Sequence, residues 1–514
     1  MSSALTPWKA AAVAAAFFVL ACRPNLRPHT VVMAWEAFPL SLDPRSGNDQ
    51  ASERLLGLTH QGLLRRDAQL HLVPDGCLAW RWEVPYTELV FDFPAPGMEP
   101  IGWFQFSPGR FLRAEDALWS VKALMDPAVR GAKASVFQSG IEAAWVAGTT
   151  LHLKLNAADS GFPANLIRGG LGLVPEGASG DDPPGTGPYR IASIVPEQRI
   201  LLEARKDHPD IIGRPDPQDL ELRLMPDAAA RLLALRHGSV QLALSNLPLD
   251  LAAAAGPGVE VRTVRGAGEE YVAFRCTDPA LKDARVRRAL SLALDRDLMV
   301  RALRNGWARP GWAFFPPESE AGVQAPGPAP DMAARRAEAE RLLDAAGFAR
   351  RPGAPRISLT LLTTPELEAR TKALAIQDQW RRIGVDLRLE SKEFGALFAD
   401  VLAGRFQVVS LRWVGVTDPA ILRRIFHSRS VPPGGFNRGR FADSETDRLL
   451  DEADAAGPAR RLELLKATQA RIAEEAPYAV LWWPDQVVVA APGVRVDLNG
   501  AGDFSAVWRD NRTP

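Results

Sequence analysis

One stretch in the second half of the chain alternates strand and helix signals, and this alternation restricts the kind of sheet that the chain can form. Ile357–Leu362 is apolar, Val385–Glu390 alternates apolar and charged residues, and Gln407–Trp413 is again rich in apolar residues. Helical patterns over residues 364–383 and 394–403 separate these strands, and each is followed by a glycine. Strands joined through helices pair in parallel, with right-handed crossovers. The stretch therefore predicts an α/β fold with a parallel sheet and helices on its faces.

The first helix of this stretch carries start and packing signals. Thr364 suits the N-cap position, and Pro365 suits the first helical position. Leu367, Leu374, Trp380 and Ile383 recur at near-helical spacing. We therefore predict that a helix begins directly after Thr364.

The end of the third strand is the first place to expect a ligand. In open α/β sheets, ligands bind beyond the carboxyl ends of the strands. The third strand ends at Trp413, and the chain continues through Gly415 to Asp418 and Pro419. We expect Trp413 and this loop to face a crevice. The alternative is that Trp413 is a core residue and that Asp418 and Pro419 only form a turn.

The N-terminal segment is typical of an exported protein. Residues 1–21 contain one basic residue, Lys9, then an apolar run and small residues before Cys22. This is the pattern of a signal peptide, because a membrane-spanning helix needs ~20 apolar residues. Cys22 after Val-Leu-Ala resembles a bacterial lipoprotein processing site, where the new N-terminal cysteine is acylated. We expect residues 22–29 to be a lipid-anchored tether to the membrane and the remainder to lie in the periplasm or cell envelope. The alternative is an ordinary or uncleaved signal peptide with an incidental cysteine.

The length and the charge of the chain exclude some broad classes of protein. A chain of 514 residues is too long for one hydrophobic core, so two or three domains are expected. Lys plus Arg and Asp plus Glu both number 61, so the chain lacks the basic excess of a nucleic-acid-binding protein. We therefore expect no nucleic-acid partner.

A search for catalytic and metal-binding motifs finds little. Residues 177–181 miss the last glycine of a G-x-S-x-G motif, and neither a phosphate-binding loop nor Cys-x-x-Cys occurs. None of the seven histidines has the spacing that places two metal ligands on one helical face. We expect no metal, no cofactor and no enzymatic activity. Cys77 and Cys276 are either unrelated thiols or, in an oxidising compartment, a disulfide.

Five motifs, in a fixed order along the chain, carry a family resemblance. They are Ser41–Pro44 (SLDP), Phe111–Lys122 (FLRAEDALWSVK), Gly185–Tyr189 (GTGPY), Arg285–Asp295 (RVRRALSLALD) and Trp413–Pro419 (WVGVTDP). Each motif alone is weak, but their order is specific and extends from about residue 30 to residue 490. In this order they resemble the family 5 extracellular solute-binding proteins, the peptide-, nickel- and oligopeptide-binding components of ABC importers.

The resemblance implies a bilobed periplasmic-binding-protein clamshell, type II-like, with an extra inserted domain. Lobe I would comprise residues 30–52, 178–268 and 487–514, the inserted domain residues 53–177, and lobe II residues 269–486. A peptide or other small molecule would bind between the lobes of a monomer and be delivered to the permease of an ABC transporter. An exported hydrolase or a non-transport lipoprotein receptor on the same fold are the alternatives.

The resemblance also implies ligand-binding positions, with one departure. In peptide-binding members, an aspartate in the Trp loop pairs with the α-amine of the ligand. Here the third residue after Trp413 is Val416, so that carboxylate is missing. Because an unpaired buried ammonium group is unfavourable, we expect a ligand other than a standard peptide with a free N-terminus. The candidate ligand-lining residues are Trp413, Gly415, Asp418, Tyr271, Trp35 and Glu36.

Overall fold

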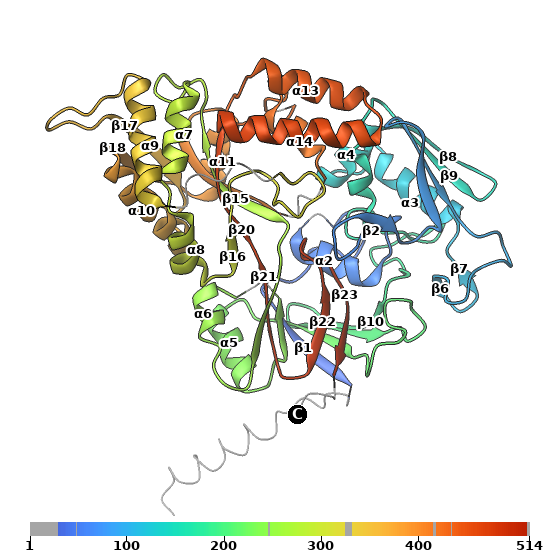
Figure 1. Ribbon diagram of the computed structural model, residues 1–514. Helices are drawn as coiled ribbons and strands as arrows, with labels where there is room; N and C mark the ends of the chain where they lie inside the picture. Colours follow the sequence, from blue (N-terminus) through green and yellow to red (C-terminus); the bar gives the residue numbers. More distant parts are fainter. Residues whose placement is uncertain are drawn as a thin grey trace, which may run out of the picture.

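The computed structural model describes residues 29–47, 49–244, 247–323, 331–414, 418–432 and 434–510. The expected signal peptide, Cys22 and Gly415 lie outside these described residues. Three large sheets organise the molecule, with seven, six and four strands. In Figure 1 the seven-stranded sheet lies at the lower centre, the six-stranded sheet at the upper left and the four-stranded sheet at the right. Within the described ranges, no helix combines the length and the apolar character needed to cross a membrane.

The seven-stranded sheet collects strands from distant parts of the chain, in the order β10-β11-β12-β1-β13-β21-β14. These strands are β1 (Thr30–Trp35), β10 (Tyr189–Val195), β11 (Arg199–Ala204), β12 (Asp219–Leu224), β13 (Leu242–Leu244), β14 (Glu260–Val264) and β21 (Gln486–Ala490). The central strand β1 is buried along its whole length because both faces of the sheet are covered. The covering elements are α2 (Gln50–Thr59), α5 (Ala228–Arg236), α6 (Leu249–Ala253), β22 (Val494–Leu498) and β23 (Phe504–Arg509).

The six-stranded sheet has the order β16-β20-β15-β19-β17-β18 and contains the predicted parallel unit. Its strands are β15 (Gly268–Phe274), β16 (Ala308–Pro310), β17 (Ile357–Thr363), β18 (Val385–Ser391), β19 (Val408–Val414) and β20 (Tyr478–Pro484). Strand β17 pairs in parallel with both β18 and β19, which confirms the prediction, whereas β15 is antiparallel to β19 and β20. One face packs on α7 (Ala284–Leu292), α8 (Arg296–Arg304), α9 (Met332–Ala345) and α10 (Leu367–Arg382). The other packs on α11 (Phe394–Leu402), α12 (Ile421–Phe426), α13 (Ser444–Ala455) and α14 (Pro458–Glu475).

The predicted start of α10 was wrong. The helix begins at Leu367, with Glu366 as N-cap, because β17 extends to Thr363 and the next residues form the turn. Leu367 and Leu374 are 78% and 47% exposed, whereas Trp380 is fully buried. Six residues turn a helix by about 600°, which is not a whole number of turns, so Leu374 and Trp380 point in different directions. The exit was predicted correctly, since Gly384 has φ +83°.

The four-stranded sheet, in the order β4-β5-β9-β8, is entirely antiparallel. Its strands are β4 (Ala79–Val84), β5 (Glu88–Asp92), β8 (Ile141–Ala147) and β9 (Thr150–Leu155). It shares a hydrophobic core with α3 (Ala114–Met125) and α4 (Ala132–Gly140). Smaller elements nearby are β2 (Leu64–Arg66), β3 (Leu72–Pro74), β6 (Gln105–Ser107), β7 (Arg110–Phe111) and the 3-10 helix η1 (Phe162–Leu166).

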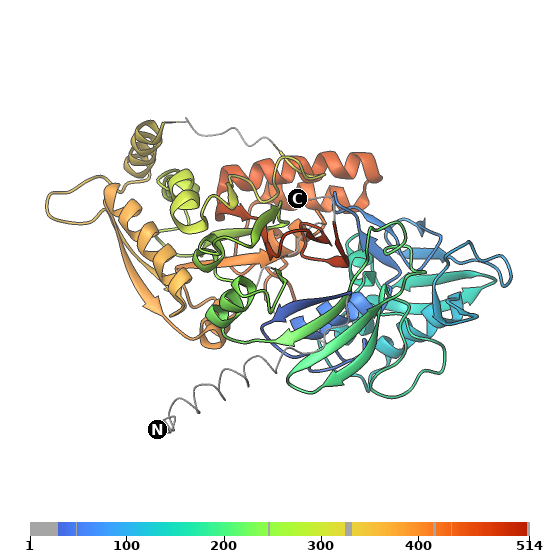
Figure 2. The ribbon, with the colours of Figure 1, turned by 90° about the horizontal axis from the view of Figure 1, so that it is seen from below.

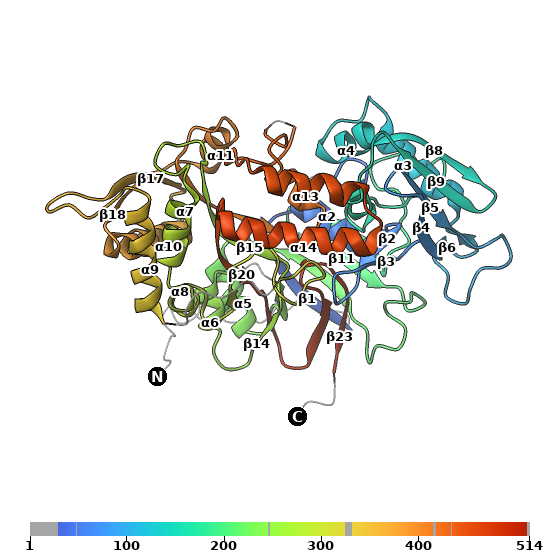
Figure 3. The ribbon, with the colours of Figure 1, turned by 45° about the horizontal axis from the view of Figure 1, so that its top comes forward.

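Helices α13 and α14 lie between the six-stranded and the four-stranded sheets (Figure 3). The Tyr86 hydroxyl donates to the Ala456 carbonyl at 3.1 Å. The Arg461 guanidinium lies 5.0 Å from the centre of the Tyr86 ring and donates to the Ser160 hydroxyl. These contacts join the part of the molecule around the four-stranded sheet to the part around the six-stranded sheet.

Two neighbouring chain crossings join the six-stranded sheet, at the left of Figure 2, to the seven-stranded sheet, at its lower centre. One runs from β14 to β15 through residues 265–267, and the other runs from β20 to β21 through Asp485. The crossings pack closely, because a Cβ atom at Gly266 would lie 1.9 Å from the Pro484 carbonyl oxygen. Only glycine fits at this position.

Candidate ligand-binding site

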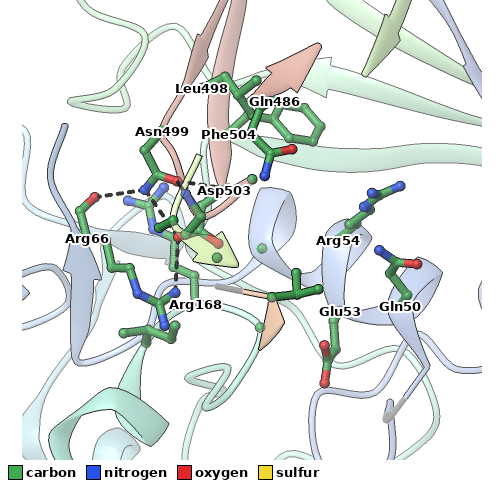
Figure 4. A pocket seen from close by; sticks show the side chains of 18 of the residues that line it. Gln50, Glu53, Arg54, Arg66, Arg168, Gln486, Leu498, Asn499, Asp503 and Phe504 are labelled. Atoms are coloured by element: carbon green, nitrogen blue, oxygen red, sulfur yellow. Dashed lines mark hydrogen bonds and ion pairs between the residues drawn. The ribbon is translucent and has the colours of Figure 1, made fainter. Parts of the chain in front are cut away.

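A cavity of about 900 Å³ lies where the parts built on the three large sheets meet. Side chains from α2, from the β2–β3 region, from residues 164–170, from the end of β19, from the two crossings and from the β22–β23 loop line it. Its size falls within the range of about 300–1,000 Å³ that is typical of small-molecule sites. Figure 4 shows residues on opposite sides of the cavity with open space between them.

Helix α2 presents one face to the cavity. Gln50, Glu53 and Arg54 are three and four residues apart, so they share a helical face, and Figure 4 shows them together at one side. Asp49 caps the helix by accepting from the backbone of its first turn. Arg54 forms an ion pair with Glu36 at 2.9 Å. Glu36, a predicted ligand-lining residue, therefore contacts a lining residue but is not itself at the cavity wall.

On another side of the cavity, β2 meets the loop between β22 and β23. The Arg66 guanidinium lies 3.2 Å from the Asp503 carboxylate. The side-chain amide of Asn499 donates to the Arg66 carbonyl at 3.5 Å and to Asp503 at 3.2 Å (Figure 4). These bonds join two segments that are more than 400 residues apart in the chain.

The third arginine on these sides is mostly buried and doubly paired. Arg168 donates to both carboxylate oxygens of Asp75, at 2.7 and 2.5 Å, and to Asp210 at 2.7 Å. Burial would raise the pKa of Asp210, but the Arg168 charge outweighs it and holds that pKa below its ordinary value. We call Arg54, Arg66 and Arg168, with their carboxylate partners, the paired wall.

The opposite boundary is the end of β19. Arg412, Trp413 and Val414 line the cavity here, and we call them the Trp413 wall. The Trp413 ring lies 5.6 Å from the Phe436 ring and stacks at 6.5 Å on Tyr271. The crevice expected beyond the carboxyl end of this strand thus coincides with the cavity.

Two further predicted residues lie in cores and not at the cavity wall. The Tyr271 ring is fully buried and stacks on Tyr478 at 4.2 Å. Trp35 is 3% exposed within the core of the seven-stranded sheet. Tyr271 lies in the middle of β15 and Trp35 at the end of β1, and helices and neighbouring strands cover both faces of these sheets, so both side chains are enclosed.

Asp418 lies at the contact between the parts built on the four-stranded and six-stranded sheets. It accepts from the Ala420 amide at 2.8 Å, and a Cβ atom at Gly161 would lie 3.4 Å from its carboxylate. Burial raises the pKa of Asp418 to about 6, and the nearby Asp159 carboxylate adds to this increase. Asp418 does not line the cavity in this structure.

Sequence reasoning missed the arginines of the cavity. Arg168 meets Asp75 and Asp210 across 93 and 42 residues of chain, so no local pattern signals this cluster. Among the described residues, no group of three His, Cys, Asp or Glu side chains is arranged to hold a metal ion. Cys77 and Cys276 are free thiols, and burial raises the pKa of Cys77 to about 12.

Comparison with known proteins places these features in a family. The model of the bacterial extracellular solute-binding proteins, family 5 Middle, matches residues 104–430. A probable di/tripeptide-binding protein 5 of Pseudomonas aeruginosa (strain UCBPP-PA14) is 26% identical over 467 residues, covering 84% of this chain and 86% of that protein. The periplasmic murein peptide-binding protein MppA of Escherichia coli (strain K12) is 29% identical over 231 residues, covering 44% and 42%.

Solved structures share the fold along nearly the whole chain. The unliganded open form of the periplasmic murein tripeptide-binding protein MppA has a TM-score of 0.79 at 20% identity, covering 94% of this chain and 97% of that one. HbpA2 from Haemophilus parasuis has a TM-score of 0.78 at 20% identity, covering 94% and 100%. The expected α/β periplasmic-binding-protein fold is confirmed. Since the family model matches more than half of the residues, the chain belongs to family 5 of the bacterial extracellular solute-binding proteins.

Proposed function

We propose that the protein captures a small solute, peptide-like or otherwise, in the 900 Å³ cavity and delivers it to the permease of an ABC transporter. The observation that carries this proposal is that all three parts of the molecule contribute to the cavity walls. The names of the relatives, a probable di/tripeptide-binding protein and a murein peptide-binding protein, support a peptide-like cargo.

The proposed mechanism is closure around the cargo. The paired wall is carried by α2, by β2 and by the segment after η1, whereas the Trp413 wall is the end of β19 in the six-stranded sheet. The two chain crossings near Gly266 and Asp485 join the six-stranded sheet to the seven-stranded sheet. A ligand that touches both walls binds the closed form more tightly and shifts the equilibrium toward it. A shift from 1:99 to 99:1 requires about 5.5 kcal/mol of differential affinity.

The proposal includes a domain division that follows the sheets. The seven-stranded sheet marks lobe I, the six-stranded sheet lobe II and the four-stranded sheet the inserted domain, with the bounds expected from the resemblance. It also includes a lipid anchor at Cys22, a location in the periplasm or cell envelope, and action as a monomer. Labelling cells with palmitate tests the anchor, because Cys22→Ser should abolish incorporation.

Capture is tested by identifying what the purified protein binds. Native mass spectrometry should show one solute per chain, and calorimetry with the released solute should show saturable binding. Small-angle scattering should show a smaller radius of gyration with ligand than without it. A protein that carries no solute and binds no member of a pool of di- to pentapeptides would contradict the proposal.

A matched pair of variants locates the site. Trp413→Ala should weaken binding about tenfold, because an aromatic surface that contacts ligand contributes on the order of 1–2 kcal/mol. Trp119→Ala is the control, since Trp119 is 39% exposed on α3 and does not line the cavity. Equal affinity of the two variants would remove Trp413 from the site.

A further inference from the structure

The charges around Trp413 indicate which kind of chemical group this end of the cavity receives. Arg438 is 8% exposed, and its guanidinium lies 4.5 Å from the Trp413 ring and 5.1 Å from the Phe398 ring. Its one side-chain hydrogen bond to a described residue is to the Tyr271 hydroxyl, at 3.2 Å. Among the described residues, its other contacts are with aromatic rings and not with a carboxylate. A buried guanidinium without a counter-ion is unfavourable, so this region favours an added negative charge.

A second arginine lies at the wall itself. Arg412 is exposed and lines the cavity, and it forms neither a hydrogen bond nor an ion pair through its side chain with any residue that the structure describes. The carboxylate nearest in the sheet is that of Glu270, directly across from Arg412 on β15. Glu270 is already shared by Lys372, at 2.8 Å, and Arg304, at 3.8 Å. Burial would raise the pKa of Glu270, but Lys372, Arg304 and Arg412 together hold that pKa below its ordinary value. Arg412 therefore shares this one carboxylate with two other cations, and a net positive charge remains.

The remaining acidic groups near Trp413 do not offset these cations. Glu269 lies directly across from Trp413 on β15 and is 2% exposed. Burial raises the pKa of the Glu269 carboxyl well above its ordinary value, which favours the neutral form. The four residues after Trp413 are Val, Gly, Val and Thr, so the next carboxylate along the chain is Asp418. Asp418 faces Gly161 and Ala420 instead of the cavity.

We infer that the Trp413 wall binds an anionic group of the ligand, with Arg412 in direct contact and Arg438 adding a second positive charge behind Trp413. The cargo class is then a carboxylate-bearing solute without a cationic group at this end. A guanidinium matches a carboxylate with two parallel hydrogen bonds. This inference rests on the proposed function and makes it more specific, since it names the charge of the cargo.

The experiment offers the purified protein a pool of di- to pentapeptides, half of them N-acetylated, at low salt. Retained peptides are identified by mass spectrometry, and their affinities are measured by calorimetry. The expected result is enrichment of acidic, N-acetylated peptides, with affinity falling as salt increases. Enrichment of peptides with free amines or basic side chains would overturn this inference but support capture. Retention of no peptide would overturn both.

Variants test the two arginines separately. Arg412→Gln should weaken binding of a retained acidic peptide about 10- to 100-fold, as expected for loss of hydrogen bonds between charged groups. Arg460→Gln is the control, because Arg460 is exposed on α14, pairs with Glu463 at 2.9 Å and is not a cavity residue. An unchanged affinity for Arg412→Gln, with the control also unchanged, would overturn the role of Arg412.

Arg438 is buried, so replacing it affects folding as well as charge, and two substitutions are needed to distinguish these effects. Arg438→Lys keeps the charge and should retain most of the affinity, whereas Arg438→Gln should lose at least tenfold as the positive charge next to Trp413 disappears. If Arg438→Gln does not fold, the comparison of Arg412→Gln with Arg460→Gln and the salt dependence of the ligand affinity still test the inference. Equal binding by folded Lys and Gln variants would show that the Arg438 charge does not contribute.

Discussion

The paired wall and the Trp413 wall both contain arginines, but they compensate them differently. Arg54, Arg66 and Arg168 each bind a carboxylate of the protein, and these bonds join segments that are distant in the chain. Around Trp413, neither Arg412 nor Arg438 has a carboxylate partner among the described residues. The paired arginines hold the cavity together, whereas we propose that the arginines around Trp413 bind an anionic group of the ligand.

Removing Arg168, which joins two carboxylates of the paired wall, should have the largest effect on stability. Arg168→Gln leaves the carboxylates of Asp75 and Asp210 without their partner, and breaking such a buried pair costs about 3–5 kcal/mol. Urea unfolding followed by tryptophan fluorescence measures the loss. Arg81→Gln, which breaks an exposed pair with Asp92, is the control and should cost under about 1 kcal/mol. Similar losses in both variants would contradict a structural role for Arg168.

Acid should destabilise the paired wall through buried histidines. Burial lowers the pKa of His208, which lies beside Asp210 and Arg168, to about 3, and that of His60 to about 4. The unfolded chain binds these protons near pH 6.5, so stability is full above pH 6.5 and falls as the pH decreases toward 4. The expected loss is about 2 kcal/mol per histidine at pH 5.

Urea unfolding between pH 7.5 and 5 measures this slope. The variant His208→Gln should have a shallower slope than the wild-type protein, because one titrating group is removed. A free energy of unfolding that stays constant over this pH range in the wild-type protein would show that the histidines do not titrate on unfolding.

Asp418 provides a test that separates stability from binding. Its pKa of about 6 lies above that of an unfolded aspartate, so the folded state loses stability as the pH rises from about 4 to about 6, and this loss is complete above pH 6. Asp418→Asn can still accept from the Ala420 amide and should raise stability by about 1–2 kcal/mol at pH 8, with no gain near pH 4. Loss of ligand affinity in this variant would instead show that Asp418 contributes to ligand binding.

The smallest expected effect on stability is at Arg412. Because this side chain is exposed and has no partner among the described residues, Arg412→Gln should change the free energy of unfolding by under about 0.5 kcal/mol. Thermal unfolding without ligand measures it, beside the loss of affinity expected above. A destabilisation comparable with that of Arg168→Gln would remove the distinction between the two walls.

Local patterns in the sequence predicted part of this architecture. The parallel unit of β17, β18 and β19 follows from residue periodicity, and the exit of α10 follows from Gly384. The sequence does not show which apolar residues of α10 are buried, because Leu374 is as apolar as a core residue and only the position of the sheet decides which face is covered. The position of Trp413 at the cavity followed from the general rule for strand ends.

The sequence by itself determined the elements that depend on neighbouring residues: strand periodicity, helix ends at glycine, and the absence of a carboxylate from the three residues after Trp413. Only the tertiary structure decided that Arg168 meets Asp75 and Asp210, that Asp418 faces Gly161, and that Arg438 stacks on Trp413. The physical reason is that charge compensation and burial depend on distances in space, and these distances are set by the packing of segments that lie far apart in the chain.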